Sequence, residues 1–320
     1  MTKHWTTLED LYQHKELSPS PELEQVSQEF QIKVSPTMQG QIADNSPDDP
    51  IYRQFIPSTE ELNILPEELY DPIGDRRFTP VEGIVHRYED RALLKLTQLC
   101  EVYCRFCFRK EMIGHKGETL SEEELINALN YIEQTPSLWE IILTGGDPLI
   151  LSARRLERVF NALVKIPHIR HLRIHTRIPV VSPERISLAH LELIEKTIDA
   201  GLAISVVIHA NHAQEFTPAA REVLLKLRRK GALLLSQSVL LKGVNDSYEA
   251  LSELMYAFIE HGIKPYYLHQ MDLARGTSHF TVEKERGRAL IKALRKGVAG
   301  ICVPTYIVEI PEGEGKRVLA

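Results

Sequence analysis

The segment from residue 100 to 107 carries three cysteines close enough together to bind one metal centre. Cys100, Cys104 and Cys107 have the spacing C-x3-C-x2-C. Zinc sites usually pair two C-x2-C knuckles or add histidines at set distances, and neither accompanies this loop. Three thiolates on a compact loop suit a cubane in which the protein binds three irons and the fourth iron is open to an outside ligand. The alternative, three buried cysteines that act as small hydrophobic side chains, fits this number and spacing poorly.

A second candidate site is the turn Thr144-Gly145-Gly146-Asp147, which follows a short apolar run. Its glycines allow backbone N–H and C=O groups to approach a small ligand closely. A two-glycine turn is a weak signal in itself and is often a plain turn, but beside the cysteine loop it indicates a site for the amino group of a bound cofactor. The fourth cysteine, Cys302, stands alone beside an apolar run and is predicted to be a core residue.

Cationic side chains that could hold a cofactor occur near both ends of the regular part of the chain. Lys316 follows the Gly-rich segment 311–315. Such a lysine is usually only solvated, but a pocket that removes water from it would lower its pKa and allow it to form a Schiff base. Arg87 and Arg91 are four residues apart and could clamp a phosphate with their planar donors, although single arginines are more often surface charges.

The composition is that of a globular protein and excludes several classes of function. Of the 320 residues, 43% are hydrophobic and 26% are charged, and the formal net charge of -6 provides no basic surface for nucleic acid. No apolar stretch reaches the roughly 18 residues that span a bilayer, and the polar N-terminal residues lack the pattern of a secretory signal. Crowded cysteines fit reduced, metal-binding thiols better than disulfides. We therefore expect a cytoplasmic protein that binds neither nucleic acid nor membranes.

The chain divides into an N-terminal extension, residues 1–80, and a core, residues 81–320. The extension is rich in Pro, Ser, Glu and Gln and predicts short helices and loops. In the core, short apolar β-prone runs alternate with amphipathic helices, of which 121–134 is the clearest because Ser121 and Glu124 predict a capping box. This alternation predicts an α/β fold, either a barrel or a doubly wound sheet. The predicted strands are 92–97, 140–144, 171–175, 203–208, 232–237, 265–269 and 304–309.

Polar clusters follow the ends of most of these predicted strands. Both architectures bind ligands at the carboxyl ends of their strands. The cysteine loop follows the first strand and the two-glycine turn follows the second, while IHTR, IHANH, SQS and HQMD end the next four. The pattern therefore predicts one active site at this edge of the sheet.

At these residues the sequence resembles a known family. The C-x3-C-x2-C loop, with Phe106 before its last cysteine, is similar to that of the radical S-adenosylmethionine superfamily. The strings that resemble lysine 2,3-aminomutases are HRYEDRALL, CEVYCRFCFRKEMIG, LTGGDPL, QSVLLKGVND, PYYLHQMD and CVPTYIVEIPEGEGK. The resemblance implies an incomplete (β/α)6 barrel and an isomerase that contains a 4Fe-4S iron–sulfur cluster, S-adenosyl-L-methionine and pyridoxal 5'-phosphate. Its reaction would convert L-lysine to β-lysine by moving the 2-amino group to C3.

The resemblance also implies a role for each candidate residue. Cys100, Cys104 and Cys107 would bind the cluster, and S-adenosylmethionine would chelate the fourth iron. The positions that match the S-adenosylmethionine site are Thr144, Gly145, Gly146, Asp147, His209 and Gln237. The positions that match the pyridoxal phosphate site are Lys316, the catalytic lysine that would carry the cofactor, and Arg87 and Arg91 near its phosphate. The positions that match the substrate site are Arg109 for the α-carboxylate of lysine, and Asp272 and Glu309 for its distal ammonium.

Three features depart from the aminomutases that act on free lysine. The second acid is Glu309 where those enzymes carry aspartate, and PEGEGK has two glutamates where they have a run of glycines. The sequence ends at Ala320 without the cysteine-containing extension that binds zinc in those enzymes, so zinc is not expected. A short chain and Glu309 are also features of the bacterial aminomutase that supplies (R)-β-lysine for elongation factor P, which is therefore an alternative.

The remaining alternatives concern the substrate and the chemistry. An aminomutase for another amino acid, such as glutamate or ornithine, would share the fold, but paired acids at 272 and 309 favour a cationic substrate tail, because a buried ammonium without partners is costly. A radical S-adenosylmethionine enzyme without pyridoxal phosphate and a non-catalytic iron–sulfur or zinc-binding regulatory protein are alternatives from other classes. The expected partners are a small-molecule amino-acid substrate and an electron donor such as flavodoxin or ferredoxin, and a homo-oligomer is compatible with the sequence.

Overall fold

The computed structural model describes residues 3–15, 17–113, 119–311 and 315–320, and these residues contain one nine-stranded sheet. Its strands lie side by side in chain order. They are β1 Ile84–Tyr88, β2 Arg91–Thr97, β3 Glu140–Gly145, β4 His171–Thr176, β5 Ala203–His209, β6 Leu233–Leu240, β7 Lys264–Gln270, β8 Thr305–Ile310 and β9 Gly315–Val318. Strands β2 to β8 are parallel, and β1 and β9 pair antiparallel at the two edges. A doubly wound sheet would reverse its strand order near the middle, so the sequential order identifies a barrel.

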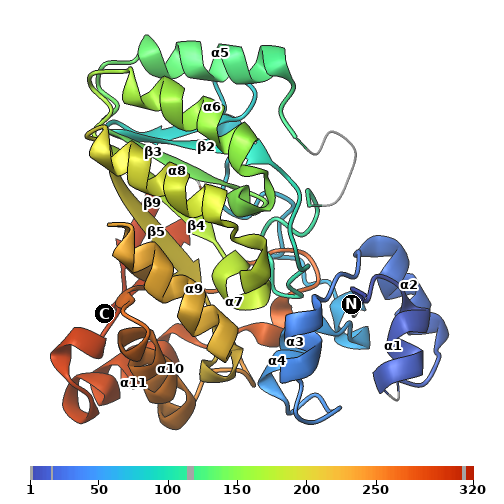
Figure 1. Ribbon diagram of the computed structural model, residues 1–320. Helices are drawn as coiled ribbons and strands as arrows, with labels where there is room; N and C mark the ends of the chain where they lie inside the picture. The colour runs from blue at the N-terminus through green and yellow to red at the C-terminus, as the bar shows by residue number, and fades with distance from the viewer. Residues whose placement is uncertain (1–2, 16, 114–118, 312–314) are drawn as a thin grey trace.

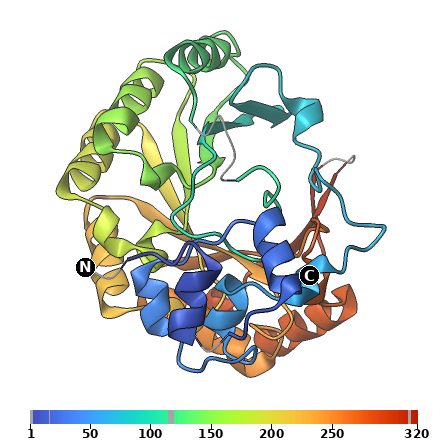
Figure 2. The same ribbon diagram turned by 90° about the vertical axis from the view of Figure 1, so that its right-hand side faces the viewer.

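Helices connect the parallel strands and lie on the outside of the curved sheet (Figures 1 and 2). Six strand–helix units run from β2 to the helix after β7, so the predicted incomplete (β/α)6 barrel is confirmed. The helices of the core are α5 Glu122–Glu133, α6 Ala153–Val164, α7 Ile178–Val181, α8 Leu188–Asp199, α9 Pro218–Arg229, α10 Tyr248–Glu260 and α11 Lys284–Gly297. The 3-10 turns are η1 Thr59–Leu62, η2 Arg76–Phe78, η3 Pro148–Ile150, η4 Pro183–Arg185, η5 Ala213–Glu215, η6 Ser278–Phe280 and η7 Gly300–Cys302.

Local sequence explains where these elements begin and which face they bury. Helix α5 begins after Ser121, whose hydroxyl accepts a hydrogen bond from the Glu124 N–H while the Glu124 carboxylate accepts one from the Ser121 N–H, so the predicted capping box is confirmed. The apolar side chains of each core helix pack inward against the sheet, and Cys302 joins this core as predicted, with 2% of its surface exposed. Within the described residues, no helix has the length and apolar character needed to cross a membrane.

The two edges of the sheet face each other (Figure 2), and individual contacts rather than a backbone ladder connect them in the described residues. The sequence did not predict β1 or β9. Arg87 on β1 forms an ion pair with Glu309 on β8, with Nη1 and Oε1 2.8 Å apart. The Lys316 N–H on β9 donates to the Tyr88 hydroxyl on β1 at 2.9 Å. These contacts close the barrel at the position of predicted cofactor residues.

The N-terminal helices lie over the end of the barrel that carries the cysteine loop (Figures 1 and 2). They are α1 Leu8–Lys15, α2 Pro21–Glu29, α3 Pro36–Gln41 and α4 Pro50–Phe55. The Arg105 N–H donates to the Gln54 carbonyl at 2.9 Å, and the Arg105 guanidinium donates to the Gln31 carbonyl at 2.8 Å and to the Glu61 carboxylate. Lys110 also donates to Glu61. The N-terminal segment therefore fixes the cysteine loop from outside the barrel.

Replacing Glu61 by glutamine is expected to destabilise the protein by about 3–5 kcal/mol, because Arg105 and Lys110 would lose their buried counter-charge. Burial alone would raise the pKa of Glu61, but the two cations outweigh it and lower the pKa from 4.5 to about 2. A carboxyl whose pKa is lower in the folded state stabilises the protein above its unfolded pKa, so the wild-type free energy of unfolding should fall between pH 4.5 and 2.

Urea unfolding at several pH values measures both effects. The exposed neighbour Glu60 provides the matched control, since Glu60→Gln should leave the free energy of unfolding nearly unchanged. Equal stabilities for the two variants at neutral pH would contradict the assignment of Glu61 as the anchor of the loop.

Candidate active site

The cysteine loop follows the end of β2, where the barrel predicts ligand binding. Cys100, Cys104 and Cys107 all border a small pocket of ≈ 40 Å³ and are partly exposed to it. The Cys107 N–H donates to the Cys104 carbonyl at 3.1 Å, and the Lys33 ammonium donates to the Cys100 carbonyl at 2.8 Å. The fold thus brings the three sulfur atoms to one pocket and orders the backbone between them.

The thiols of this loop need a cation before all three can ionise. Burial and the neighbouring Cys104 raise the pKa of Cys107 to about 12, and burial, Asp147 and the neighbouring cysteines raise the pKa of Cys100 well above its ordinary value. Thiolate ligands to iron would remove this penalty, so metal binding releases protons here. Among the described residues, no three His, Cys, Asp or Glu side chains converge as they would around a single ion. A cubane needs no such convergence because each cysteine binds a different iron, so this donor set fits a 4Fe-4S cluster.

The two-glycine turn packs directly against the start of the cysteine loop. The Gly146 N–H donates to the Thr97 carbonyl at 2.6 Å, and the Asp147 N–H donates to the Leu99 carbonyl at 2.9 Å. Gly145 has a φ of 106°, and a Cβ on Gly146 would lie 2.1 Å from the Leu99 carbonyl oxygen. These glycines therefore allow the turn and the cysteine loop to meet, a reason that the sequence did not reveal.

Replacing Gly146 by alanine is expected to destabilise the protein by about 1–3 kcal/mol, because the new methyl group would displace the Leu99 backbone. The amounts of iron and sulfide incorporated during reconstitution should also fall, since Leu99 immediately precedes Cys100. Gly300→Ala is the matched control, because a Cβ there would have no neighbour within 4 Å. Urea unfolding and metal analysis measure the two effects, and full incorporation by the Gly146 variant would contradict the expectation.

A cavity of ≈ 640 Å³ occupies the interior of the barrel and collects most of the predicted cofactor and substrate residues. It extends from Glu140 and His171 at the amino ends of β3 and β4 to the carboxyl ends of the strands. The predicted site residues that line it are Arg87, Arg91, Arg109, Thr144, Gln237, Asp272, Glu309 and Lys316. These residues come from several segments that are far apart in the sequence, so their meeting is a result of the fold.

The other predicted site residues lie outside the lining of this cavity. They are Cys100, Cys104, Cys107, Gly145, Gly146, Asp147 and His209. The Asp147 carboxylate accepts hydrogen bonds from the Thr176 hydroxyl at 2.7 Å and from the Arg177 N–H at 2.6 Å, which connects the turn to the end of β4. The His209 ring stacks on Phe106 of the cysteine loop, with the ring centres 5.7 Å apart. The fold therefore places this group on the side of the cysteine loop.

Lys316 stands on strand β9, whereas the sequence predicted a loop lysine. The chain folds back on itself after β8, and Lys316 pairs with Glu309 in the antiparallel register. Cross-strand partners point to the same side of a sheet, which explains the 3.1 Å between Lys316 Nζ and Glu309 Oε2. Glu309 thus contacts both Lys316 and Arg87. Residues 312–314 of the predicted Gly-rich stretch lie outside the described residues.

The two other cationic residues of the predicted site are held differently. The Arg91 guanidinium contacts Asp90 at 2.6 Å and lies 3.9 Å from the centre of the Tyr88 ring. The Arg109 guanidinium is buried and pairs with Asp75 at 2.8 Å, but its Nε has no hydrogen-bond partner among the described residues. Asp75 lies in a loop without any periodic pattern, so sequence reasoning missed it. Arg109 therefore keeps one free donor.

Asp272 is the acid of the cavity that has no ion pair or side-chain hydrogen bond within the described part of the chain. Burial, together with the charge of Glu309, raises its pKa to about 7. His269 lines the same cavity, and burial with the nearby Lys316 ammonium lowers its pKa to about 3, so this imidazole is neutral. Burial also keeps His175 neutral by lowering its pKa, and its Nε2 has no hydrogen-bond partner among the residues that the structure describes. Sequence reasoning assigned no role to either histidine, although both lie in polar clusters at strand ends.

Charged side chains close the opposite end of the cavity. The Arg173 Nε donates to Glu140 at 2.9 Å, and His171 Nδ1 lies 2.6 Å from the same carboxylate oxygen. His171 Nε2 also lies 2.8 Å from the Ser205 hydroxyl. These partners satisfy one another, so the open polar groups of the cavity, Arg109 Nε, His175 Nε2 and the Asp272 carboxylate, belong to its other parts.

Comparison with known proteins agrees with this arrangement. The family model described as the radical SAM superfamily matches residues 94–264. L-lysine 2,3-aminomutase of Clostridium subterminale is 35% identical over 312 residues, which cover 97% of this chain and 74% of that protein. L-lysine 2,3-aminomutase of Escherichia coli (strain K12) is 37% identical over 281 residues, which cover 88% and 81%. The resemblance found in the motifs thus extends over most of the chain.

A solved structure supports the fold alone. The crystal structure of Streptococcus suis SuiB bound to precursor peptide SuiA aligns with a TM-score of 0.51 and 13% identity, over 71% of this chain and 50% of that one. The family rests instead on the matches in sequence, which include relatives above 30% identity over more than two thirds of their length. The chain belongs to the lysine 2,3-aminomutase family of the radical SAM superfamily.

Proposed function

We propose that this protein is an aminomutase that moves the 2-amino group of L-lysine to C3 and releases β-lysine. The observation that carries the proposal is the meeting of Lys316, Arg109 and Asp272 in one barrel cavity. An amine able to bind a carbonyl cofactor, a donor for a carboxylate and an acceptor for an ammonium are the groups that lysine and pyridoxal phosphate require. The amino-acid substrate agrees with the family of the chain.

We assign the proposed cofactors to the two pockets, the small pocket at the cysteine loop and the cavity inside the barrel. Cys100, Cys104 and Cys107 would hold the 4Fe-4S cluster, which would supply the electron for reductive cleavage of S-adenosylmethionine to methionine and a 5'-deoxyadenosyl radical. Pyridoxal phosphate, when bound, delocalises the unpaired electron during the migration of nitrogen. Of the residues proposed for S-adenosylmethionine, Thr144 and Gln237 line the cavity, and Gly145, Gly146, Asp147 and His209 lie on the side of the cysteine loop.

Within the cavity, this chain's residues bind and orient the cofactor. Lys316 must lose a proton before its nitrogen can bond to a carbonyl carbon, and Glu309 Oε2, 3.1 Å away, is placed to accept that proton. Arg87 lies on the other oxygen of Glu309 and compensates its charge. We assign the phosphate to Arg87 and Arg91, which both line the cavity.

The two ends of lysine are assigned to different walls of the cavity. The free Nε–H of Arg109 is suited to the α-carboxylate, since a carboxylate can accept a bond there without displacing Asp75 from Nη2. Asp272 is suited to the distal ammonium because its carboxylate lacks an ionic partner and would gain one. Glu309 is the second acid that the family resemblance assigns to the distal ammonium. Its carboxylate would bind the substrate ammonium in addition to Arg87 and Lys316.

The electron must come from outside the chain. We propose that this donor is a low-potential protein such as flavodoxin or ferredoxin. We also propose a reducing compartment, the cytoplasm, because the cluster ligands are free thiols.

The assembly of the protein into a homo-oligomer stays a prediction. The N-terminal extension, residues 1–80, and the core, residues 81–320, are proposed to act as one unit, since the extension holds the cysteine loop through Arg105.

Anaerobic turnover tests the proposed function. The reconstituted protein is incubated with dithionite, S-adenosylmethionine, pyridoxal phosphate and either L-lysine, L-ornithine or L-glutamate, and the β-amino acid products are identified. β-Lysine from lysine supports the proposal. Turnover of another amino acid without β-lysine would refute the substrate, and protein that takes up zinc but no iron and sulfide would refute the chemistry.

A further inference from the structure

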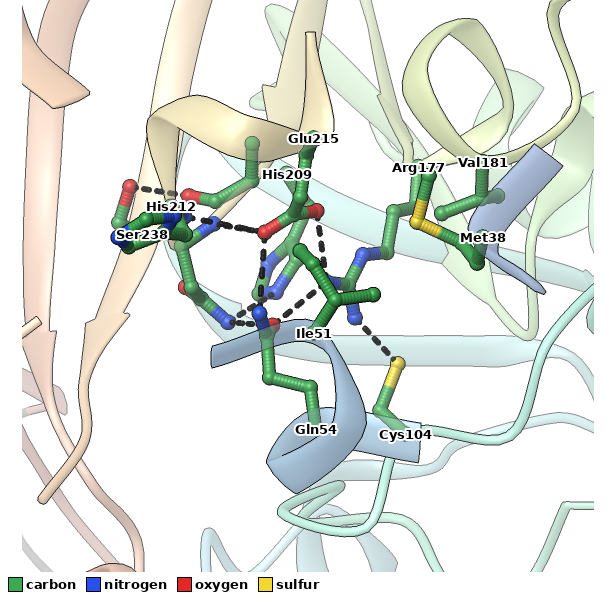
Figure 3. Close-up of polar contacts among 12 residues, drawn as sticks. Met38, Ile51, Gln54, Cys104, Arg177, Val181, His209, His212, Glu215 and Ser238 are labelled. Carbon is green, nitrogen blue, oxygen red and sulfur yellow. Dashed lines mark hydrogen bonds and ion pairs between the residues drawn. The ribbon is translucent and has the colours of Figure 1, made fainter. Parts of the chain in front are cut away.

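Arg177 directs a buried positive charge at one of the three cysteines. It follows the end of β4 and has 7% of its surface exposed. Its Nη1 donates to the Cys104 sulfur at 2.7 Å, as Figure 3 shows. The Nε of Arg177 has no partner among the described residues, so the guanidinium retains a further donor on the same group. Neither the motifs nor the cavity assigned a role to this residue.

A buried network holds the guanidinium in this position (Figure 3). Arg177 Nη2 donates to Glu215 Oε2 and to Gln54 Oε1, each at 2.7 Å. Glu215 is fully buried, and its other oxygen accepts the backbone N–H groups of Asn211 at 2.7 Å and His212 at 3.0 Å. Gln54 comes from the N-terminal helix α4, and Glu215 comes from η5 after β5. Three separate parts of the chain therefore fix one cation against Cys104.

Apolar side chains pack around the guanidinium. The Arg177 guanidinium lies over the Phe55 ring at 4.6 Å and the Phe106 ring at 5.5 Å. Met38 and Ile51, drawn beside the network in Figure 3, are fully buried. Charges in such surroundings are screened little by solvent, so their effect on a neighbouring redox centre is large.

We propose that Arg177 is a positioning residue that raises the reduction potential of the cluster through its hydrogen bond to Cys104, and that Glu215 opposes it. The inference rests on the proposed cluster and goes beyond it, because it states how this chain sets the potential. Hydrogen bonds to cluster sulfurs and nearby charges are known controls of iron–sulfur potentials. Reduction adds one electron to the cluster and makes it more negative. A cation at Cys104 favours that state, and the Glu215 carboxylate behind the cation weakens the effect.

Two substitutions at the same contact should therefore shift the potential in opposite directions. Arg177→Gln removes the positive charge and should lower the midpoint potential. Glu215→Gln removes the opposing negative charge and should raise it. Gln54→Leu removes a neutral partner of the same network and should shift the midpoint potential less than Arg177→Gln or Glu215→Gln does. A general loosening of the site would move all three variants in the same direction.

The measurement is a dye-mediated redox titration of the reconstituted protein without S-adenosylmethionine, followed by the EPR signal of the reduced cluster. Iron and sulfide analysis confirms that each sample holds one cluster. Opposite shifts for Arg177→Gln and Glu215→Gln support the proposal, and equal potentials or shifts of one sign overturn it. If Arg177→Gln holds no cluster, Glu215→Gln decides, with a positive shift supporting the proposal and any other result overturning it. A wild-type protein that assembles no cluster overturns the proposed function together with this inference.

Discussion

Lys316→Ala is expected to abolish the visible absorbance of bound pyridoxal phosphate and to reduce β-lysine formation by about 10³-fold or more. The side chain is the amine of the cavity that stands beside a carboxylate able to take its proton. Without it, the cofactor would have no covalent attachment and no fixed orientation toward the substrate. Iron and sulfide content should stay unchanged, because Lys316 does not border the cysteine pocket.

The adjacent Arg317 provides the matched control. It lies on the same strand, its side chain is exposed and it does not line the cavity. Arg317→Ala should retain both the absorbance and the activity. Full activity of the Lys316 variant in the presence of pyridoxal phosphate would refute the assignment of this lysine as the residue that attaches the cofactor. That result would not bear on the cluster chemistry.

Asp272→Asn is expected to raise KM for lysine by about 10²-fold, since it removes the charge proposed to pair with the buried ammonium of the substrate. Wild-type KM should also fall as the pH rises through 7, because the pKa of Asp272 is about 7 and only its ionised form attracts the ammonium. The variant should lose this pH dependence. A KM profile that is the same for wild type and variant would show that the ammonium binds elsewhere.

The same substitution should stabilise the protein in the absence of substrate. Burial and Glu309 raise the pKa of Asp272 from 3.8 to about 7. The unfolded chain therefore releases this proton at a lower pH than the folded protein, and the free energy of unfolding decreases between pH 3.8 and 7. At pH 8 the melting temperature of Asp272→Asn should exceed that of the wild type by several degrees. The exposed Asp199→Asn is the control and should show no such rise.

The parallel part of the barrel could be predicted from the sequence because each of its strands is buried on its outer face and pairs on both sides. The run 203–208 became β5, and the run 140–144 became β3, with differences of one residue. The edges could not be predicted in this way. Strand β1 contains His86, Arg87 and Tyr88, and its polar side chains give no apolar run.

The candidate site was predictable where single residue types carry the chemistry and not where distant loops provide partners. The spacing of three cysteines indicates a cluster by itself. The pairs Arg109–Asp75 and Arg177–Glu215 join segments 34 and 38 residues apart, and no local pattern marks them. The sequence also could not show that Glu309 and Lys316 are cross-strand neighbours, because the hairpin register creates that contact.

The joint between the first and last strands has a consequence for cofactor loading. Backbone ladders hold every other neighbouring pair of strands, but the Arg87–Glu309 ion pair and the hydrogen bond from the Lys316 N–H to the Tyr88 hydroxyl connect these two edges. Two of these four are the residues proposed to hold the phosphate and the aldehyde carbon of pyridoxal phosphate. The bound cofactor would therefore contact both edges of the sheet and stabilise their association. Amide hydrogen exchange in β1 and β9 should slow when the cofactor binds, while exchange in the central strands should change little.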